Sequence, residues 1–208
     1  NQLTQDMYRY QDIIVIDFEG FKGKPPSMVG IWEKYANRNQ PYYRVIILDQ
    51  DLKGLVDITD LRANYVVLIE FMETIIARAR RENKKIIAYS NHELLKFGES
   101  GIDISDCYVN ARAETSRWFS INQKPNRPKP LGLKPVLKYL NYPVLVEYGT
   151  QRVTEKIKRI KNQLILHKQD PTKLTPLAQE NWRDLVAYNE QDVRGLVYVL
   201  EQIGLLKP

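Results

Sequence analysis

The chain alternates between short runs of β-branched and aromatic residues and longer segments with helical periodicity. The first run, residues 13–17, reads Ile-Ile-Val-Ile-Asp and predicts a buried strand. Two further apolar and aromatic runs cover residues 29–35 and 42–48. The break between these two runs, residues 36–41, contains Asn, Arg, Gln and Pro, so we expect a hairpin there.

Helical spacing begins after the second of these runs. Residues 57–60 are mostly polar, and apolar residues then recur at helical spacing within residues 61–82, which predicts a long helix. Residues 85–89 predict a short strand, followed at once by a helix that ends near Gly98. Residues 106–109 predict one more strand.

After the last predicted strand, the chain is predicted to contain an irregular loop and three helices. Residues 122–130 contain Pro125, Pro128 and Pro130 and therefore predict irregular structure inside the domain. Helices are predicted over residues 133–140, 153–166 and 180–203. The order of elements predicts one α/β domain spanning the whole chain, whose mixed sheet has an antiparallel hairpin on one side, parallel strands on the other, and flanking helices.

Composition narrows the class of protein. The 208 residues suit one medium-sized domain, and a single cysteine, Cys107, excludes a disulfide framework and a cysteine-based zinc site. That cysteine content favours a reducing compartment. No apolar stretch is long enough to span a bilayer, and no signal-peptide pattern opens the chain. We therefore expect an intracellular protein, cytoplasmic or nuclear, with no membrane partner.

The positive charge of the chain indicates a possible class of ligand. The formal net charge is +6, which is compatible with a phosphate-rich ligand. Residues 115–131 contain four basic residues and no acidic one, with Trp118 and Phe119 among them. Basic side chains beside aromatic ones can hold the backbone of a nucleic-acid strand and stack its bases. Residues 151–168 are also basic, but there a solvated helix face is the preferred interpretation.

The first predicted strand ends in two carboxylates. Asp17 and Glu19 are two residues apart, so on a strand their side chains point to the same side. Like charges this close repel strongly unless a cation or a proton lies between them. Mg²⁺ suits such a pair, because its preferred ligands are carboxylate oxygens. A solvated strand end would contain the same residues, so this segment alone leaves both interpretations open.

A third carboxylate lies on the last predicted helix. Tyr188 and Asp192 are four residues apart and therefore share one face of that helix. Leu185 and Val193 are core candidates, so this face is expected to lie near the sheet. A carboxylate in such a position needs a partner or a metal ion. Glu190 is the better candidate for the solvated side of the helix.

These two segments resemble motifs of the DEDD exonucleases, which belong to the ribonuclease H-like superfamily. Asp17-Phe18-Glu19 on a first strand resembles their first motif, and Tyr188-x-x-x-Asp192 on a late helix resembles their third. The tyrosine subgroup, DEDDy, is the one that matches. The histidine subgroup has His five residues before the last Asp, and Ala187 stands at that position here.

The resemblance extends along most of the chain. Residues 131–140, Leu-Gly-Leu-Lys-Pro-Val-Leu-Lys-Tyr-Leu, resemble a helix that precedes the third motif in many of these enzymes. The similarity then covers about residues 12–203 in order. It implies a ribonuclease H-like fold.

The second motif departs from the family pattern. The family has Asn or His followed after two or three residues by Phe-Asp, whereas residues 88–93 read Ala-Tyr-Ser-Asn-His-Glu. Glu93 falls where the Asp is expected and is the candidate ligand. In the competing interpretation Ser90 and Glu93 form a capping box that opens a helix. Asp106 is the reserve ligand, and His92 is expected to pack or cap locally, because hard oxygen sites rarely use imidazole.

The resemblance implies a two-metal phosphodiester hydrolase. Two ions, Mg²⁺ or Mn²⁺, would be bound by carboxylates, and a tyrosine would orient the attacking water. The implied reaction releases nucleoside monophosphates from the 3′ end of a DNA or RNA strand. The implied catalytic residues are Asp17, Glu19, Glu93, Tyr188 and Asp192, of which the four acids are the metal ligands.

Further residues are expected to hold the strand. Gly20 and Phe21 would line the pocket for the terminal base and sugar, and Arg117, Trp118 and Lys134 would contact the strand behind it. The unusual second motif raises an alternative, a nucleic-acid-binding module that cuts weakly or not at all. An endonuclease on the same fold is the other alternative.

Overall fold

The computed structural model describes residues 7–58, 63–144 and 152–208, and its architecture is α/β. Within these residues six strands form one mixed sheet in the order β5-β4-β3-β2-β6-β7. In chain order, the strands are β2 (Ile13–Gly20), β3 (Pro26–Glu33), β4 (Tyr42–Ile47), β5 (Asn64–Tyr65), β6 (Lys85–Ala88) and β7 (Tyr108–Asn110). A separate parallel pair, β1 (Tyr8–Arg9) and β8 (Leu206–Lys207), joins the two ends of the described chain.

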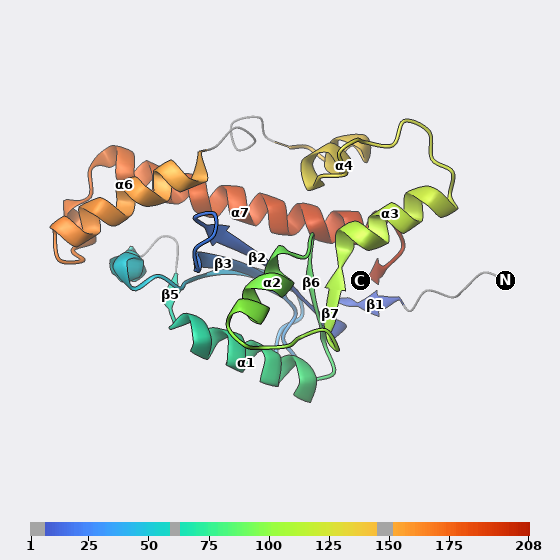
Figure 1. Ribbon diagram of the computed structural model, residues 1–208, viewed down its shortest axis with the longest axis horizontal. Helices are drawn as coiled ribbons and strands as arrows, with labels where there is room; N and C mark the ends of the chain where they lie inside the picture. Colours follow the sequence, from blue (N-terminus) through green and yellow to red (C-terminus); the bar gives the residue numbers. More distant parts are fainter. Residues whose placement is uncertain (1–6, 59–62, 145–151) are drawn as a thin grey trace.

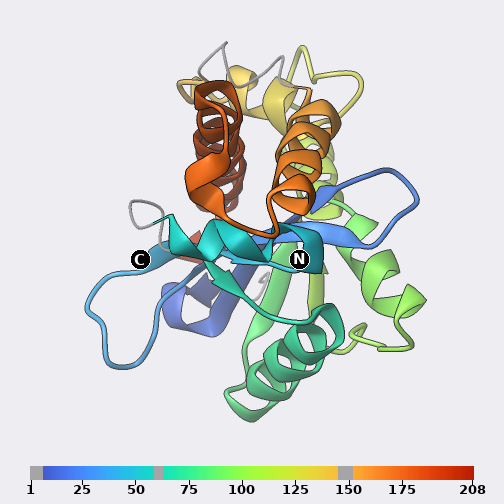
Figure 2. The ribbon, with the colours of Figure 1, turned by 90° about the vertical axis from the view of Figure 1, so that its left-hand side faces the viewer.

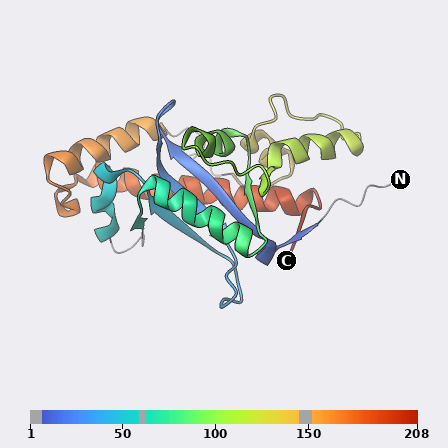
Figure 3. The same cartoon turned by 60° about the horizontal axis from the view of Figure 1, so that its bottom comes forward.

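Helices cover both faces of the sheet. They are α1 (Leu68–Arg81), α2 (His92–Glu99), α3 (Ala111–Ile121), α4 (Leu133–Tyr139), α6 (Val153–Leu166) and α7 (Pro176–Gln202), with short 3₁₀ helices η1 (Tyr10–Asp12), η2 (Gln50–Asp57) and η3 (Pro171–Lys173). Figure 1 shows α1 and α2 below the sheet and α3, α4, α6 and α7 above it. Figure 2 shows α6 and α7 side by side above the strands, and Figure 3 shows α1 crossing in front of them. No helix in the described part of the chain is long and apolar enough to cross a membrane.

The central strand is β2, and its pairing divides the sheet into two halves. β2 pairs antiparallel with β3, which pairs antiparallel with β4, so the predicted hairpin is confirmed. On its other edge β2 pairs in parallel with β6, which pairs in parallel with β7. The predicted mixed sheet is therefore confirmed, with an additional parallel strand, β5, beyond β4.

The alternation of side chains along β2 decides which side of the sheet each residue faces. Ile14, Ile16 and Phe18 pack in one hydrophobic cluster with α1 and α2. Ile13 and Val15 pack in another cluster with α7. Since successive side chains of a strand point to opposite faces, the odd-numbered residues of β2 face α7.

Several predicted boundaries shift. The long helix begins at Leu68, because β5 occupies residues 64–65 at the edge of the sheet. The last helix begins earlier than predicted, at Pro176, because Thr175 accepts a hydrogen bond from the main-chain N–H of Ala178 and caps it. The sequence analysis also missed α3, whose polar surface gives a weak helical pattern. Residues 59–62 and 151 of the predicted segments lie outside the described residues.

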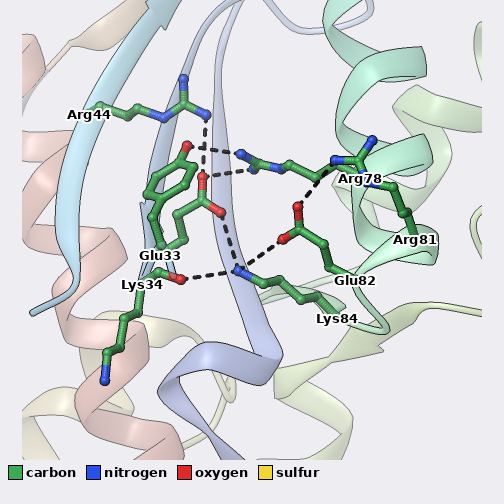
Figure 4. Close-up of polar contacts among 8 residues, drawn as sticks. Glu33, Lys34, Arg44, Arg78, Arg81, Glu82 and Lys84 are labelled. Carbon is green, nitrogen blue, oxygen red and sulfur yellow. Dashed lines mark hydrogen bonds and ion pairs between the residues drawn. The ribbon is translucent and has the colours of Figure 1, made fainter. Parts of the chain in front are cut away.

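A buried ion cluster, defined here as Glu33, Arg44, Arg78 and Lys84, closes one end of the sheet (Figure 4). The side chain of Glu33 is 1% exposed, and its carboxylate lies 2.7 Å from Arg78, 3.4 Å from Arg44 and 3.9 Å from Lys84. Arg78 also donates to the hydroxyl of Tyr35 at 3.0 Å. One acid thus contacts three cations and ties β3, β4, α1 and the residue before β6 together, while Lys84 also pairs with Glu82 at 3.4 Å.

Candidate metal centre

Two ligands of the candidate centre come from the end of β2. Asp17 and Glu19 are odd-numbered, so their side chains face α7, as the two-residue spacing predicts. The strand pairing with β3 shifts register between Glu19 and Gly20, which ends the regular ladder directly after the second carboxylate. An irregularity of this kind re-aims side chains beside functional sites.

The third ligand comes from the middle of α7. One side of this helix faces the core and includes Leu185, Val193 and Leu196. Asp192 lies at the edge of that side. Carboxylate oxygens of Asp17, Glu19 and Asp192 all lie within 4.8 Å of one another. The predicted convergence of these three residues, which are up to 175 positions apart, is therefore found in the structure.

Burial and mutual repulsion make the three carboxylates reluctant to ionise. Burial, followed by the charges of Glu19, Glu93 and Asp192, raises the pKa of Asp17 well above its usual range. Burial and the Asp192 charge raise the pKa of Glu19 to about 7, although Lys134 acts against that shift. Burial raises the pKa of Asp192 to about 6, again against Lys134. The three carboxyls therefore hold their protons more tightly than isolated carboxyls, and Lys134 only partly offsets this for Glu19 and Asp192.

The donor set fits a hard divalent cation. All three residues offer carboxylate oxygens, which Mg²⁺ and Mn²⁺ prefer. One oxygen of Asp192, Oδ1, is buried and has no hydrogen-bond partner among the described residues. Buried polar atoms are normally paired, so this unpaired carboxylate oxygen is available to bind a cation. The acidic cluster could therefore hold a metal ion.

Tyr188 and Lys134 border the cluster on the α4 side. The Lys134 amine donates to the Tyr188 hydroxyl at 2.7 Å and lies 4.1 Å from the centre of its ring. Burial, followed by the charges of Asp192, Glu19 and Asp17, raises the pKa of the Tyr188 hydroxyl. The phenol is consequently protonated at neutral pH. Lys134 was predicted as a strand contact, and the structure places it beside the carboxylates.

Glu93 is buried next to the three carboxylates without joining them. Its side chain is 4% exposed, and its Oε1 accepts a hydrogen bond from the main-chain N–H of Phe18 at 3.5 Å. The other oxygen, Oε2, has no partner among the described residues, and burial raises the pKa of the group to about 7. Glu93 therefore stays a candidate ligand, reached through its free oxygen.

Two competing predictions for the second motif are wrong: the capping box of Ser90 and Glu93, and Asp106 as the reserve ligand. The N-cap of α2 is Asn91, without a side-chain capping bond, so Ser90 and Glu93 do not form the capping box. Asp106 is exposed and pairs with Arg80 at 2.9 Å, which removes it as the reserve ligand. His92 is exposed at the start of α2, and its expected packing or capping role stays a prediction.

A cavity of about 300 Å³ opens beside Glu19. It is lined by Gly20 and Phe21, as predicted for the terminal base and sugar, together with His92 and Lys96. A second cavity of about 770 Å³ shares the turn after β2 with the first and continues toward α6. Phe21 lines both cavities, whereas Gly20 lines only the smaller one beside Glu19.

Arg117 and Trp118 have local partners on α3. Arg117 lies 4.0 Å from Glu114, and Trp118 packs edge-on against Phe119 and under the amine of Lys124. Trp118 is also part of the margin of the α7 hydrophobic cluster. These contacts are local to the α3 region, and the role of both residues in holding a strand stays a prediction.

The sequence analysis missed three residues behind the centre. Asn189 is fully buried and donates to the Asp17 carboxylate at 2.8 Å. Its own oxygen accepts from the Tyr43 hydroxyl at 2.8 Å, and it lies against Gly30 of β3. A glycine inside an otherwise apolar strand was the available signal, since such a residue often marks the close approach of another group.

The raised pKa values predict an unusual pH dependence of stability. Each carboxyl binds its proton more tightly in the folded protein than in the unfolded chain, so without metal the unfolding free energy falls as pH rises from about 4.5 to about 7. Chemical denaturation in EDTA across this range measures the fall. The double variant Glu19→Gln, Asp192→Asn should flatten the curve, and equal slopes in both proteins would contradict the prediction.

Comparison of the chain with protein-family models, with curated proteins and with solved structures gave no match. The chemistry of this protein must therefore be inferred from the centre itself.

Proposed function

We propose that the chain is a metal-dependent 3′–5′ exonuclease with a ribonuclease H-like fold. The observation that supports this proposal best is the meeting of Asp17, Glu19 and Asp192 within 4.8 Å. The three residues come from a first core strand and a late helix, in the chain order of the DEDDy motifs. Two Mg²⁺ or Mn²⁺ ions would be held by these carboxylates and by the free oxygen of Glu93.

The proposed reaction is hydrolysis of the terminal phosphodiester of a single strand. The oxygen of water joins the phosphorus, the bond to the 3′ oxygen of the preceding nucleotide breaks, and that oxygen takes a proton. The products are a nucleoside monophosphate and a strand one nucleotide shorter. When bound, the cations supply Lewis-acid activation of the water and stabilise charge on the leaving oxygen.

The remaining residues have supporting roles in this proposal. Because burial and nearby acids raise the pKa of Tyr188, its hydroxyl orients the water through a hydrogen bond rather than removing a proton. Lys134 holds that hydroxyl from α4. The small cavity beside Glu19, with Phe21 in its wall, has the size and the apolar surface to receive the terminal base.

An end-labelled oligonucleotide tests the proposal. The protein should shorten a single strand from its 3′ end with Mg²⁺ or Mn²⁺, and EDTA should stop the reaction. Matched DNA and RNA strands identify the substrate, and a strand blocked at both ends detects endonuclease cleavage. If metal-loaded protein leaves all of these strands intact, the exonuclease proposal is wrong.

One observation favours a second candidate, a nucleic-acid-binding module that does not cut. Glu93 is held by the Phe18 main chain and lies outside the set of three close carboxylates, which weakens a four-acid centre. A crystal soaked in Mn²⁺ separates the candidates. Anomalous peaks between Asp17 and Asp192 support the enzyme, whereas strand binding without such peaks supports the module.

The turn after β2 is expected to contribute to strand affinity. Lys22 and Lys24 are exposed and line both cavities, whereas Lys161 is neutralised by Asp49 and Asp51 at 2.8 and 3.0 Å. The double variant Lys22→Glu, Lys24→Glu should bind single strands more weakly and reduce the salt slope by about 0.7 per lost phosphate contact. Fluorescence anisotropy at several salt concentrations measures both effects, with the exposed Lys53→Glu as the control. An unchanged slope would exclude these lysines as phosphate contacts.

A further inference from the structure

Asn189 connects three elements at a single buried amide. Its side chain is 0% exposed, and its Nδ2 donates to Asp17 Oδ2 at 2.8 Å and to the Asp17 main-chain oxygen at 3.2 Å. Its Oδ1 accepts from the hydroxyl of Tyr43 at 2.8 Å. The Tyr43 bond fixes which end of the amide faces Asp17. The donor is therefore held in place by a residue of β4 that does not itself touch the carboxylate.

The sheet has room for this amide because β3 has a glycine at the point of contact. Gly30 pairs with Asp17 across β2 and β3, and a Cβ atom at Gly30 would lie 1.6 Å from Asn189 Oδ1. Any other residue at this position would therefore displace the amide. Glycine weakens a strand interior, so a glycine here indicates that the contact itself is required.

The Asn189 amide constrains the side chain of Asp17 as well as its main chain. A helix that merely needed an anchor on the sheet could use the Asp17 main-chain oxygen alone. The shorter bond goes to the carboxylate, at 2.8 Å against 3.2 Å for the main-chain oxygen, so one carboxylate oxygen is held by the amide. Groups that orient a metal ligand in this way commonly change metal affinity by about 10–100-fold when they are removed.

We propose that Tyr43 and Asn189 are a positioning pair that orients the Asp17 carboxylate for divalent cation binding. Neither residue touches the cation or the substrate. Tyr43 acts through Asn189, and Asn189 acts through Asp17 and through its hydrogen bond to Glu19. The inference rests on the proposed function for its effect on cleavage, but its effect on cation binding can be measured without any cleavage.

Calorimetric titration of the full chain with Mn²⁺ is the test. Asn189→Ala should weaken Mn²⁺ binding about 10–100-fold. Tyr43→Phe removes only the hydroxyl that holds the amide, so it should weaken binding in the same direction by less. In the nuclease assay both variants should need more Mn²⁺ for half-maximal rate and regain most of the rate at saturating Mn²⁺.

Two matched variants control for loss of packing. Asn181 is another buried asparagine of α7, 3% exposed and outside the cluster, and Asn181→Ala should leave Mn²⁺ affinity unchanged. Tyr198 donates a hydrogen bond from its hydroxyl to the main-chain oxygen of Leu140 at 2.9 Å. Tyr198→Phe should likewise leave Mn²⁺ affinity unchanged. Should Asn189→Ala fail to fold, the milder Tyr43→Phe still decides.

The outcomes separate this inference from the proposed function. Unchanged Mn²⁺ affinity in Tyr43→Phe and in folded Asn189→Ala would overturn the positioning pair while leaving exonuclease activity possible. Weakened Mn²⁺ binding in a protein that cleaves nothing would support the pair and reject the exonuclease. Wild-type protein that binds no Mn²⁺ would overturn both.

Discussion

Asp192→Asn is expected to abolish cleavage and at the same time to stabilise the metal-free protein. The substitution keeps the shape of the side chain and removes one of three negative charges that lie within 4.8 Å of one another. Losing a charged ligand should lower the rate by about 10³-fold, the upper end of the range for removing one charge-stabilising group. Losing the repulsion should raise the unfolding free energy in EDTA by about 1 kcal/mol.

Two measurements on one variant check this expectation. The oligonucleotide assay gives the rate, and thermal unfolding with and without Mn²⁺ gives the stability. Wild-type protein should be stabilised by about 2.7 kcal/mol at a Mn²⁺ concentration 100 times its dissociation constant, and Asp192→Asn should lose most of that gain. Glu190→Gln is the control on the same helix, because Glu190 pairs with Arg194 at 2.8 Å on the surface. Metal-dependent cleavage by Asp192→Asn at the wild-type rate would remove Asp192 from the centre.

Glu33→Ala is expected to cause the largest loss of stability, without any direct effect on the metal centre. Removing the carboxylate leaves the buried guanidinium of Arg78, and the Arg44 and Lys84 cations beside it, without their shared partner. Breaking a buried ion pair from one side costs about 3–5 kcal/mol. For a chain of this size the midpoint of thermal unfolding should fall by about 6–20 °C.

Glu82→Ala is the matched control for this prediction. Glu82 also pairs with Lys84, at 3.4 Å, but its side chain is 37% exposed, so its loss should cost less than about 1 kcal/mol. The double variant Glu33→Ala, Arg78→Met should recover part of the lost stability, because one uncompensated cation is then absent. Calorimetry gives all three midpoints, and a Glu33→Ala midpoint near that of Glu82→Ala would show that water reaches and screens the cluster.

The main elements and the three residues of the acidic cluster were predictable because their signals are local. A β-branched run ending in Asp17 and Glu19 identifies a strand and the face of its last side chains, through a period of two residues. The spacing of Tyr188 and Asp192 on a strongly apolar helix identifies their common face through a period of 3.6 residues. The resemblance to the order of the DEDDy motifs then leads us to expect that the two faces meet.

The residues that were missed or misplaced depend on contacts between distant segments. Nothing in the sequence around Asn189 shows that it reaches Asp17, 172 residues away, or that Gly30 makes room for it. Glu93 fits a capping box by its spacing, and only the packing of α2 beside β2 turns its carboxylate toward the Phe18 N–H. Arg117 and Trp118 satisfy a compositional pattern for strand binding, but the hydrophobic surface around α3 takes up the tryptophan.

The long helix α7 has a consequence for how activity is lost on heating. This single helix of 27 residues packs in two hydrophobic clusters and also supplies Asp192, Tyr188 and Asn189. If α7 detached from the sheet, both hydrophobic clusters would lose their packing. Asp192 would move away from Asp17 and Glu19 in the same event. Thermal inactivation should therefore coincide with global unfolding, with no temperature interval in which a folded chain has lost its centre.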